Sequence, residues 1–79
     1  MQVTILSLRK IEYQGQAVSL NVKTTSGEIT VLNHHLPLVT TLESGRIILT
    51  DNDGQKITFP VNGGFLEVAE GNKLTAFIS

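Results

Sequence analysis

Apolar and polar residues alternate along most of this chain, so that its dominant hydrophobic period is two residues. The alternation is clearest at residues 18–22, 57–61, 66–68 and 74–78. Successive side chains of a strand point to opposite faces, so this period is typical of a strand with one buried face. Further β-branched or leucine-rich runs of strand length occupy residues 3–8, 29–32, 38–42 and 46–50. No segment of ten or more residues shows the spacing of an amphipathic helix.

Short groups rich in glycine and asparagine separate these runs and predict turns, because both residues adopt positive φ at low cost. They are Gln14-Gly15-Gln16, Ser26-Gly27, Ser44-Gly45, Asp53-Gly54, Asn62-Gly63-Gly64 and Gly71-Asn72. The clearest hairpin signal is Asp51 to Gly54, which lies between two apolar runs. Turn signals at a spacing of roughly 8–12 residues, without helices, predict an all-β sandwich or barrel. The length allows one domain, over residues 1–79.

The composition favours a protein that docks onto a partner. Charged residues make up 16% of the chain, against about 25% in typical soluble domains. A small domain has much surface per residue, so this deficit leaves neutral surface exposed, and such surface commonly marks an interaction site. The net charge of −1 and the scattered basic residues argue against nucleic-acid binding. The absence of cysteine rules out a disulfide and fits a reducing compartment.

The sequence carries no signal for export or membrane insertion. No apolar run approaches the ~20 residues that a helix needs to cross a bilayer. Residues 1–6 lack the basic region and the small-residue cleavage site of a signal peptide. We therefore expect a protein that is cytosolic or attached to a larger assembly, without direct insertion into the bilayer.

Catalysis by this chain is not expected, and no catalytic, cofactor-binding or metal-ligating residue is predicted. His34 and His35 are adjacent, so on an extended chain their imidazoles point to opposite faces and cannot share one ion. A Ser-His-Asp hydrolase would need a Gly-x-Ser-x-Gly elbow, which the chain lacks. A phosphate-binding glycine loop leads into a helix, whereas residues 62–64 lead into a predicted strand. A metal-dependent enzyme is therefore a hypothesis that rests only on the two histidines.

The most informative segment runs from Gly27 to Thr40 and combines a turn glycine, a carboxylate, two imidazoles and a proline with apolar residues. Glu28 follows the turn glycine directly. It is either a hydrated turn acid, as most loop charges are, or a contact to a partner. Pro37 fixes its own φ and biases Leu36 toward an extended conformation, so it is expected to begin a strand. These residues suggest a docking surface on a β-sandwich.

Several motifs, taken with their order and spacing, point to a known family. A Gly-Glu-Ile/Leu-Gly-Ile-Leu-Pro-x-His-x-Pro-Leu-Val-Thr pattern is matched by Gly27, Glu28, Ile29, Val31, Leu32, His35, Pro37, Leu38, Val39 and Thr40. An aromatic-x-Gly turn is matched by residues 13–15, a Gly-Gly-Phe-Leu-Glu-Val motif by residues 63–68, and a final strand by residues 72–75. Essentially end to end, the chain resembles the N-terminal β-sandwich domain of the epsilon subunit of F-type ATP synthase.

The chain departs from that family's pattern at two places and in length. Thr30 stands where the family usually has a second glycine, and Asn33-His34 replaces its Pro-Asn or Pro-Gly step. Family members commonly continue into a C-terminal two-helix hairpin that can block rotation and, in some, binds ATP. The sequence stops at Ser79, so it resembles the short forms without that hairpin. Inhibition by helix insertion and nucleotide binding by the hairpin are then expected to be absent.

The resemblance implies a flattened antiparallel β-sandwich of about ten short strands in two sheets. It also implies a non-catalytic rotor subunit at the foot of the central stalk, between the gamma subunit and the polar loops of the c-ring. Such a subunit couples proton- or sodium-driven rotation to ATP synthesis elsewhere in the complex, as a peripheral protein on the cytoplasmic face of the membrane. Carried over by position, the c-ring contacts are Ser26, Gly27, Glu28 and Thr30, and the gamma contacts are Ser7, His35 and Thr40.

The rival hypothesis is a free-standing β-sandwich that binds a small ligand or a peptide through a concave pocket or an open edge strand. The few aromatic residues weigh against a sugar-stacking site, and Phe59 and Phe65 are expected in the core because both lie in alternating strands. No cofactor is expected under either hypothesis. The isolated chain is expected to be a monomer or a weak dimer, since exposed docking surface favours self-association.

Overall fold

The computed structural model describes all residues from Met1 to Ser79 and contains eight strands and no helix. The strands are β1 (Gln2–Leu6), β2 (Ile11–Gln16), β3 (Ser19–Thr24), β4 (Gly27–Leu32), β5 (Leu38–Thr50), β6 (Lys56–Val61), β7 (Gly64–Ala69) and β8 (Lys73–Ile78). The structure thus has no helix that could cross a membrane. The all-β prediction is confirmed, whereas the expected number of about ten strands is too high.

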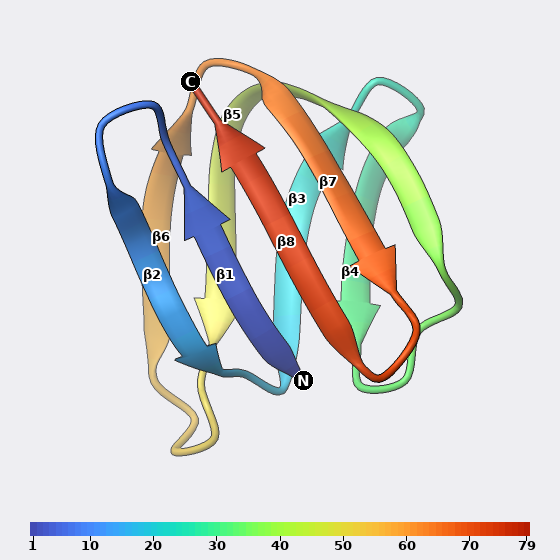
Figure 1. The fold of residues 1–79 in the computed structure, drawn as a ribbon. Helices are drawn as coiled ribbons and strands as arrows, with labels where there is room; N and C mark the ends of the chain where they lie inside the picture. The colour runs from blue at the N-terminus through green and yellow to red at the C-terminus, as the bar shows by residue number, and fades with distance from the viewer.

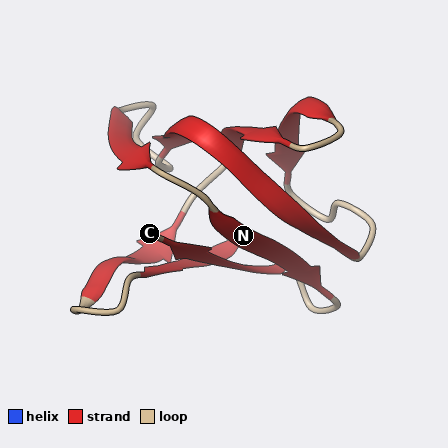
Figure 2. Ribbon diagram, turned by 90° about the horizontal axis from the view of Figure 1, so that it is seen from above, coloured by secondary structure: helices blue, strands red, loops and turns tan.

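The strands form two layers that pack face to face (Figure 1, Figure 2). One layer has the order β2-β1-β8-β7 followed by the first part of β5. The other has the order β4-β3 followed by the last part of β5 and then β6. Neighbouring strands are antiparallel except β1 and β8, which are parallel. The strand count is low because one strand, β5, serves both layers.

Strand β5 joins the layers because it continues through a position where the sequence predicts a turn. Its residues Leu38 to Leu42 pair with β7, and its residues Gly45 to Thr50 pair with β6. The predicted turn at Ser44-Gly45 is therefore wrong, and the two predicted strands form one strand of 13 residues. Gly45 has a φ of 155°, which a residue with a Cβ rarely adopts. The chain bends here from one sheet into the other without leaving the strand.

The connection between β1 and β2 lies earlier in the chain than the sequence predicts. The predicted strand over residues 3–8 ends at Leu6, and the Ser7 N–H then donates to the Lys10 carbonyl at 3.0 Å across a turn. The predicted turn at residues 14–16 is wrong, because these residues belong to β2. Gly15 instead makes room for the Tyr13 ring, whose hydroxyl would lie 3.1 Å from an added Cβ. The other predicted turns, Ser26-Gly27, Asp53-Gly54, Asn62-Gly63-Gly64 and Gly71-Asn72, do lie at strand connections, although Gly27 and Gly64 are already the first residues of β4 and β7.

The core between the layers follows the alternation of the strands and gathers 16 buried apolar residues in one cluster. Its largest fully buried side chains are Ile5, Leu20, Ile47, Leu49, Leu66 and Leu74. Phe59 packs against this cluster, as predicted, and its ring meets Tyr13 edge-on with centroids 6.0 Å apart. Phe65, which the sequence assigns to the core, is 52% exposed. The reason is that Leu66 and Val68 take the inward positions of β7.

Candidate functional site

A buried threonine holds the turn between β3 and β4. The Thr24 hydroxyl donates to the Gly27 carbonyl at 2.7 Å and accepts from the Ser26 N–H at 3.1 Å. Thr24 is 4% exposed and is the only buried polar side chain, so these bonds satisfy a hydroxyl that would otherwise be costly to bury. These bonds therefore fix the conformation of the turn. The turn lies at the upper end of the sandwich in Figure 1.

Glu28 and Thr30 follow this turn and are exposed on β4. The Asn21 side-chain amide, on the neighbouring strand β3, donates to a Glu28 carboxylate oxygen at 3.2 Å and to the Thr30 hydroxyl at 2.9 Å. Lys23 lies directly opposite Glu28 in the strand register. Asn21 thus orients both side chains. The four residues predicted to contact the c-ring lie together at this turn. We call them the hairpin tip: Ser26, Gly27, Glu28 and Thr30.

The three residues predicted to contact gamma do not form one cluster. Ser7 lies in the β1–β2 turn, at the end of the sandwich that holds the C-terminus, where it lines a cavity together with the last residues of the chain. His35 lies in the β4–β5 loop at the opposite end, where this loop bonds to the N-terminus. Thr40 is half-buried in the first part of β5. A single partner that touched all three would have to extend along the sandwich.

An apolar row that the sequence did not predict crosses the outer face of the layer that contains β1, β2, β7 and β8. The strand register places Ile11 beside Leu6, Leu6 beside Phe77, and Phe77 beside Phe65. The rings of Phe65 and Phe77 stack with centroids 5.6 Å apart and an interplanar angle of 18°. Ile11, like Phe65, is more than half exposed. We call these four residues the outer apolar row.

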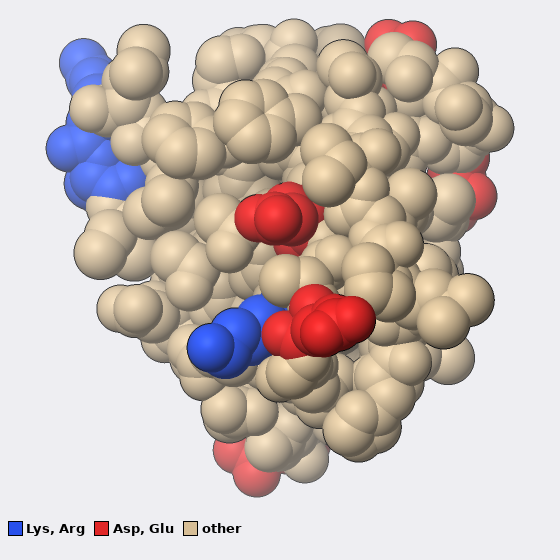
Figure 3. Space-filling model, turned by 45° about the vertical axis from the view of Figure 1, so that its right-hand side comes forward, with Lys and Arg blue, Asp and Glu red and all other residues tan.

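The alternation in β7 could have predicted that Phe65 is exposed. Phe65 is two residues from the exposed Glu67 and therefore lies on the same face of the strand, whereas the buried Leu66 lies on the other face. On the side of the molecule that Figure 3 turns forward, acidic and basic side chains lie amid uncharged surface. Val39, in that part of β5, is 71% exposed. Exposed apolar side chains that lie next to one another are typical of a protein–protein contact.

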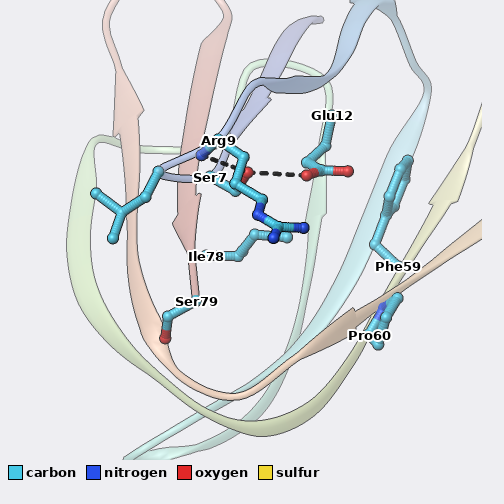
Figure 4. A pocket seen from close by; sticks show the side chains of 8 residues that line it. Ser7, Arg9, Glu12, Phe59, Pro60, Ile78 and Ser79 are labelled. Atoms are coloured by element: carbon cyan, nitrogen blue, oxygen red, sulfur yellow. Dashed lines mark hydrogen bonds between the residues drawn. The ribbon is translucent and has the colours of Figure 1, made fainter.

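An open cavity of about 310 Å³ lies at the end of the sandwich that holds the C-terminus (Figure 4). Phe59 of β6 and Ile78 of β8 contribute to its apolar wall, and the β1–β2 turn contributes its polar side. The Ser7 hydroxyl in that turn accepts from the backbone N–H of Arg9 at 3.3 Å and donates to a Glu12 carboxylate oxygen of β2 at 2.8 Å. The cavity therefore combines an apolar wall with one acidic and one basic side chain, Glu12 and Arg9.

The two histidines make separate local contacts. The backbone N–H of His34 donates to the Asn72 side-chain oxygen at 2.6 Å, and Nδ1 of His35 lies 2.7 Å from the Leu36 carbonyl oxygen. No group of three or more His, Cys, Asp or Glu side chains comes together in the structure. Zinc sites in proteins use three or four protein ligands. The structure therefore gives the hypothesis of a metal-dependent enzyme no support.

Taken together, these features describe a small all-β sandwich domain with an ordered, exposed hairpin tip and an exposed apolar row on its outer face. Residues 1–76 match the model of the family described as ATP synthase, Delta/Epsilon chain, beta-sandwich domain. The chain belongs to this family.

Relatives in this family include epsilon chains of bacterial ATP synthases. The chain is 44% identical over 71 residues to the ATP synthase epsilon chain of Endomicrobium trichonymphae, a match that covers 90% of this chain and 51% of that protein. It is 37% identical over 67 residues to the corresponding chain of Dichelobacter nodosus, covering 85% of this chain and 47% of that protein. This chain therefore spans about half the length of these relatives.

Solved structures share the fold at low sequence identity. A chain of the Euglena gracilis mitochondrial ATP synthase assembly of OSCP, F1 and c-ring has a TM-score of 0.90 and 22% identity, and the match covers 96% of this chain and 48% of that chain. A chain of the Tetrahymena thermophila mitochondrial ATP synthase central stalk and c-ring has a TM-score of 0.82 and 18% identity, with 99% and 62% covered. These matches agree on the architecture of the sandwich.

Proposed function

We propose that this chain is a non-catalytic part of the rotor of an F-type ATP synthase and belongs to the central stalk. It links the gamma subunit to the c-ring and couples ion-driven rotation to ATP synthesis by other subunits. In this role it is a peripheral component on the cytoplasmic face of the membrane. The observation that carries the proposal is the match of residues 1–76 to the β-sandwich domain of the delta and epsilon chains.

A part that transmits torque between two partners must resist deformation, and the fold is consistent with this requirement. Of the 47 backbone hydrogen bonds, 37 lie within the regular strands. The 13-residue strand β5 belongs to both layers, and the buried cluster fills the space between them. Shearing one layer against the other would disturb hydrogen bonds and close packing together, which makes the sandwich stiff.

We assign the c-ring contact to the hairpin tip. Its residues are exposed, and the Thr24 hydroxyl and the Asn21 amide fix the turn and the Glu28 carboxylate respectively. An ordered carboxylate loses little conformational freedom when it pairs with a basic or hydrogen-bonding group of a partner. A charge pair shielded at an interface couples more strongly than an exposed pair, so Glu28 is the residue expected to contribute most.

We assign the gamma contact to the predicted residues Ser7, His35 and Thr40 and to the outer apolar row. The row reaches this part of β5 because its last member, Phe65, lies directly opposite Thr41, whereas Thr40 has the opposite phase and pairs with Leu66. An exposed aromatic pair supplies the large apolar area that protein interfaces use at their centre. The chain has no cysteine, so single-cysteine variants at the three predicted positions would each report separately on crosslinking to gamma.

The c-ring assignment is tested by Glu28→Gln, with Asp53→Asn as the matched control. The glutamine side chain of Glu28→Gln retains an oxygen that can accept from Asn21, so the fold and the turn are expected to be unchanged. Retention on the intact rotor should fall about three- to tenfold at low salt, since a shielded charge contact is lost. Asp53 is exposed in the β5–β6 turn and belongs to neither proposed contact, so its exchange should leave retention on the rotor unchanged.

The measurement is co-purification with the rotor at low and at high salt. If Glu28→Gln is retained as well as the unaltered chain under both conditions, the role of Glu28 is wrong. If the unaltered chain itself binds neither gamma nor the c-ring, the proposed function fails as a whole.

A second candidate function is that of a free-standing module that binds a small ligand or a peptide. The open cavity beside Ser7, with an apolar wall and the Arg9 side chain at its border, is the observation that favours it. Affinity purification from native membranes separates the two candidates. A rotor part is recovered with gamma and c-ring subunits, whereas a free-standing module is recovered without them.

A further inference from the structure

The β4–β5 loop begins with a β-turn whose two central residues are not the ones that its backbone conformation favours. The His35 N–H donates to the Leu32 carbonyl at 3.2 Å, which closes a β-turn over residues 32–35. His34 is the third residue of this turn and has a φ of 63°, whereas the φ of Asn33 is not positive. This combination matches a type II turn, which favours proline at the second position and glycine or asparagine at the third. Asn33 and His34 occupy those positions here.

Asn72, in the β7–β8 turn, supplies contacts that compensate for this sequence. Its side-chain oxygen accepts from the His34 N–H at 2.6 Å, and its side-chain amide donates to the Asn33 side-chain oxygen at 3.3 Å. Its carbonyl accepts from the Gln2 N–H at 3.0 Å. One asparagine thus bonds to both central residues of the turn and is itself tied to β1.

The N-terminus holds the same turn from a second side. The Met1 ammonium group donates to the Ala17 carbonyl at 2.8 Å and also to the Asn33 side-chain oxygen that Asn72 contacts. Hydrogen bonds from a charged donor are stronger than those between neutral groups. We call the contacts of Asn33 and His34 with Asn72 and Met1 the loop clasp.

The loop that the clasp holds presents exposed side chains on a fixed backbone. His34 and His35 are exposed, and Leu36 is 79% exposed. Pro37 restricts the backbone at the other end of the loop, directly before β5. A loop held in one conformation loses less entropy when a partner binds to it, which is how preorganisation raises affinity.

We propose that Asn72 is a positioning residue that presets the β4–β5 loop, residues 33–37, for docking onto the gamma subunit. Asn72 acts through the backbone of His34 and the side chain of Asn33 and does not itself form the contact. This inference rests on the proposed function, because His35 belongs to the predicted gamma contacts. It goes beyond that function by naming a residue outside the contact set that controls the conformation of the docking loop.

Two sets of variants distinguish the effect of the Asn72 contacts from the effect of the turn's own sequence. Asn72→Gly removes both side-chain bonds and keeps a residue suited to the φ of 60° found at this position. The double variant Asn33→Pro, His34→Gly gives the turn the residues that a type II turn prefers, so the loop should hold its shape without Asn72. Leu32, at the end of β4, is already extended and therefore suits a following proline.

Two measurements follow each variant. Hydrogen exchange by NMR on the isolated chain should show the His34 amide exchanging about tenfold faster in Asn72→Gly, since it loses its acceptor. Affinity for gamma should fall by up to about tenfold, because fewer molecules hold the binding conformation. When Asn72→Gly is added to the double variant, affinity should stay within about twofold of the double variant alone.

Unchanged exchange of the His34 amide in Asn72→Gly would overturn the clasp. Faster exchange with unchanged affinity would overturn the docking role, and so would an equal loss of affinity in both backgrounds. An unaltered chain that binds neither gamma nor the c-ring contradicts the proposed function and with it the docking role. The exchange measurement needs no partner, so it decides the clasp independently of that outcome.

Discussion

Replacing Gly64 by alanine tests how closely β7 approaches β8. A Cβ at Gly64 would lie 1.8 Å from the Phe77 carbonyl oxygen, a main-chain atom that no side-chain rotation can move. An added Cβ at Gly63 would instead have the Ser79 hydroxyl oxygen as its nearest neighbour, at 3.7 Å. Both glycines have positive φ, 144° at Gly63 and 131° at Gly64. Comparing the two substitutions therefore separates steric contact from backbone strain.

The two variants should differ strongly in the free energy of unfolding. Gly63→Ala carries only the strain of its φ, about 2 kcal/mol, which lowers the melting temperature by roughly 8–16 °C in a domain of this size. Gly64→Ala carries a similar strain and also pushes apart two paired strands, so we expect a loss of at least about 4 kcal/mol. A domain of this length typically has about 4–12 kcal/mol in total. Gly64→Ala should therefore lose at least about a third of this stability and melt well below Gly63→Ala.

Urea denaturation followed by circular dichroism measures both free energies under the same conditions. The slope of the unfolding curve for Gly63→Ala should match that of the unaltered chain, which shows that the denatured states are comparable. If Gly64→Ala melted within a few degrees of Gly63→Ala, the close approach of β7 and β8 would be wrong. The outer apolar row would then lose its basis, because it depends on the pairing of Phe65 with Phe77.

Three further predictions concern stability and are measured by the same denaturation curves. Thr24→Val should cost about 1–3 kcal/mol, because the β3–β4 turn loses a buried hydroxyl that both donates and accepts. Leu20→Ala should cost about 2–5 kcal/mol, since Leu20 is fully buried, whereas Val39→Ala should change the stability by less than about 0.5 kcal/mol. Asp51→Ala should cost about 1–2 kcal/mol, because one Asp51 oxygen accepts from two backbone N–H groups at 2.9 Å; Asp53→Ala, which removes no such acceptor, should cost little. Equal effects within either pair, or a negligible effect of Thr24→Val, would contradict the assigned contacts.

The strands could be predicted wherever alternation continued without interruption, as in β6 and β8. The two wrongly predicted turns both contain a glycine. Gly15 lies under the Tyr13 ring within β2, and Gly45 lies at the bend of β5. A glycine serves a turn, a close approach or a bend equally well, and only the tertiary neighbours decide among these. The sequence alone therefore could not distinguish them.

The candidate site was predictable to a similar degree. The order and spacing of motifs around Glu28 led to residues that the structure places together on one hairpin. The outer apolar row was missed because Phe65 was assigned by residue type and not by the phase of its strand. The supporting contacts of Asn21 and Asn72 could not be predicted. Each depends on which strands or turns lie side by side, and that is fixed by register across long sequence separations.

The two proposed docking regions lie on different layers, so force between them has to cross the sandwich. The hairpin tip belongs to β4 and β3, and the outer apolar row belongs to β7, β8, β1 and β2. In the hydrogen-bonded order of strands, the path from one group to the other passes through β5. Its bend at Gly45 could act as a hinge, but Leu42 and Ile47, on either side of the bend, are both buried in the common core. Rotating one half of β5 relative to the other would expose one of these side chains, so we expect β5 to transmit force as a rigid element that does not bend at Gly45.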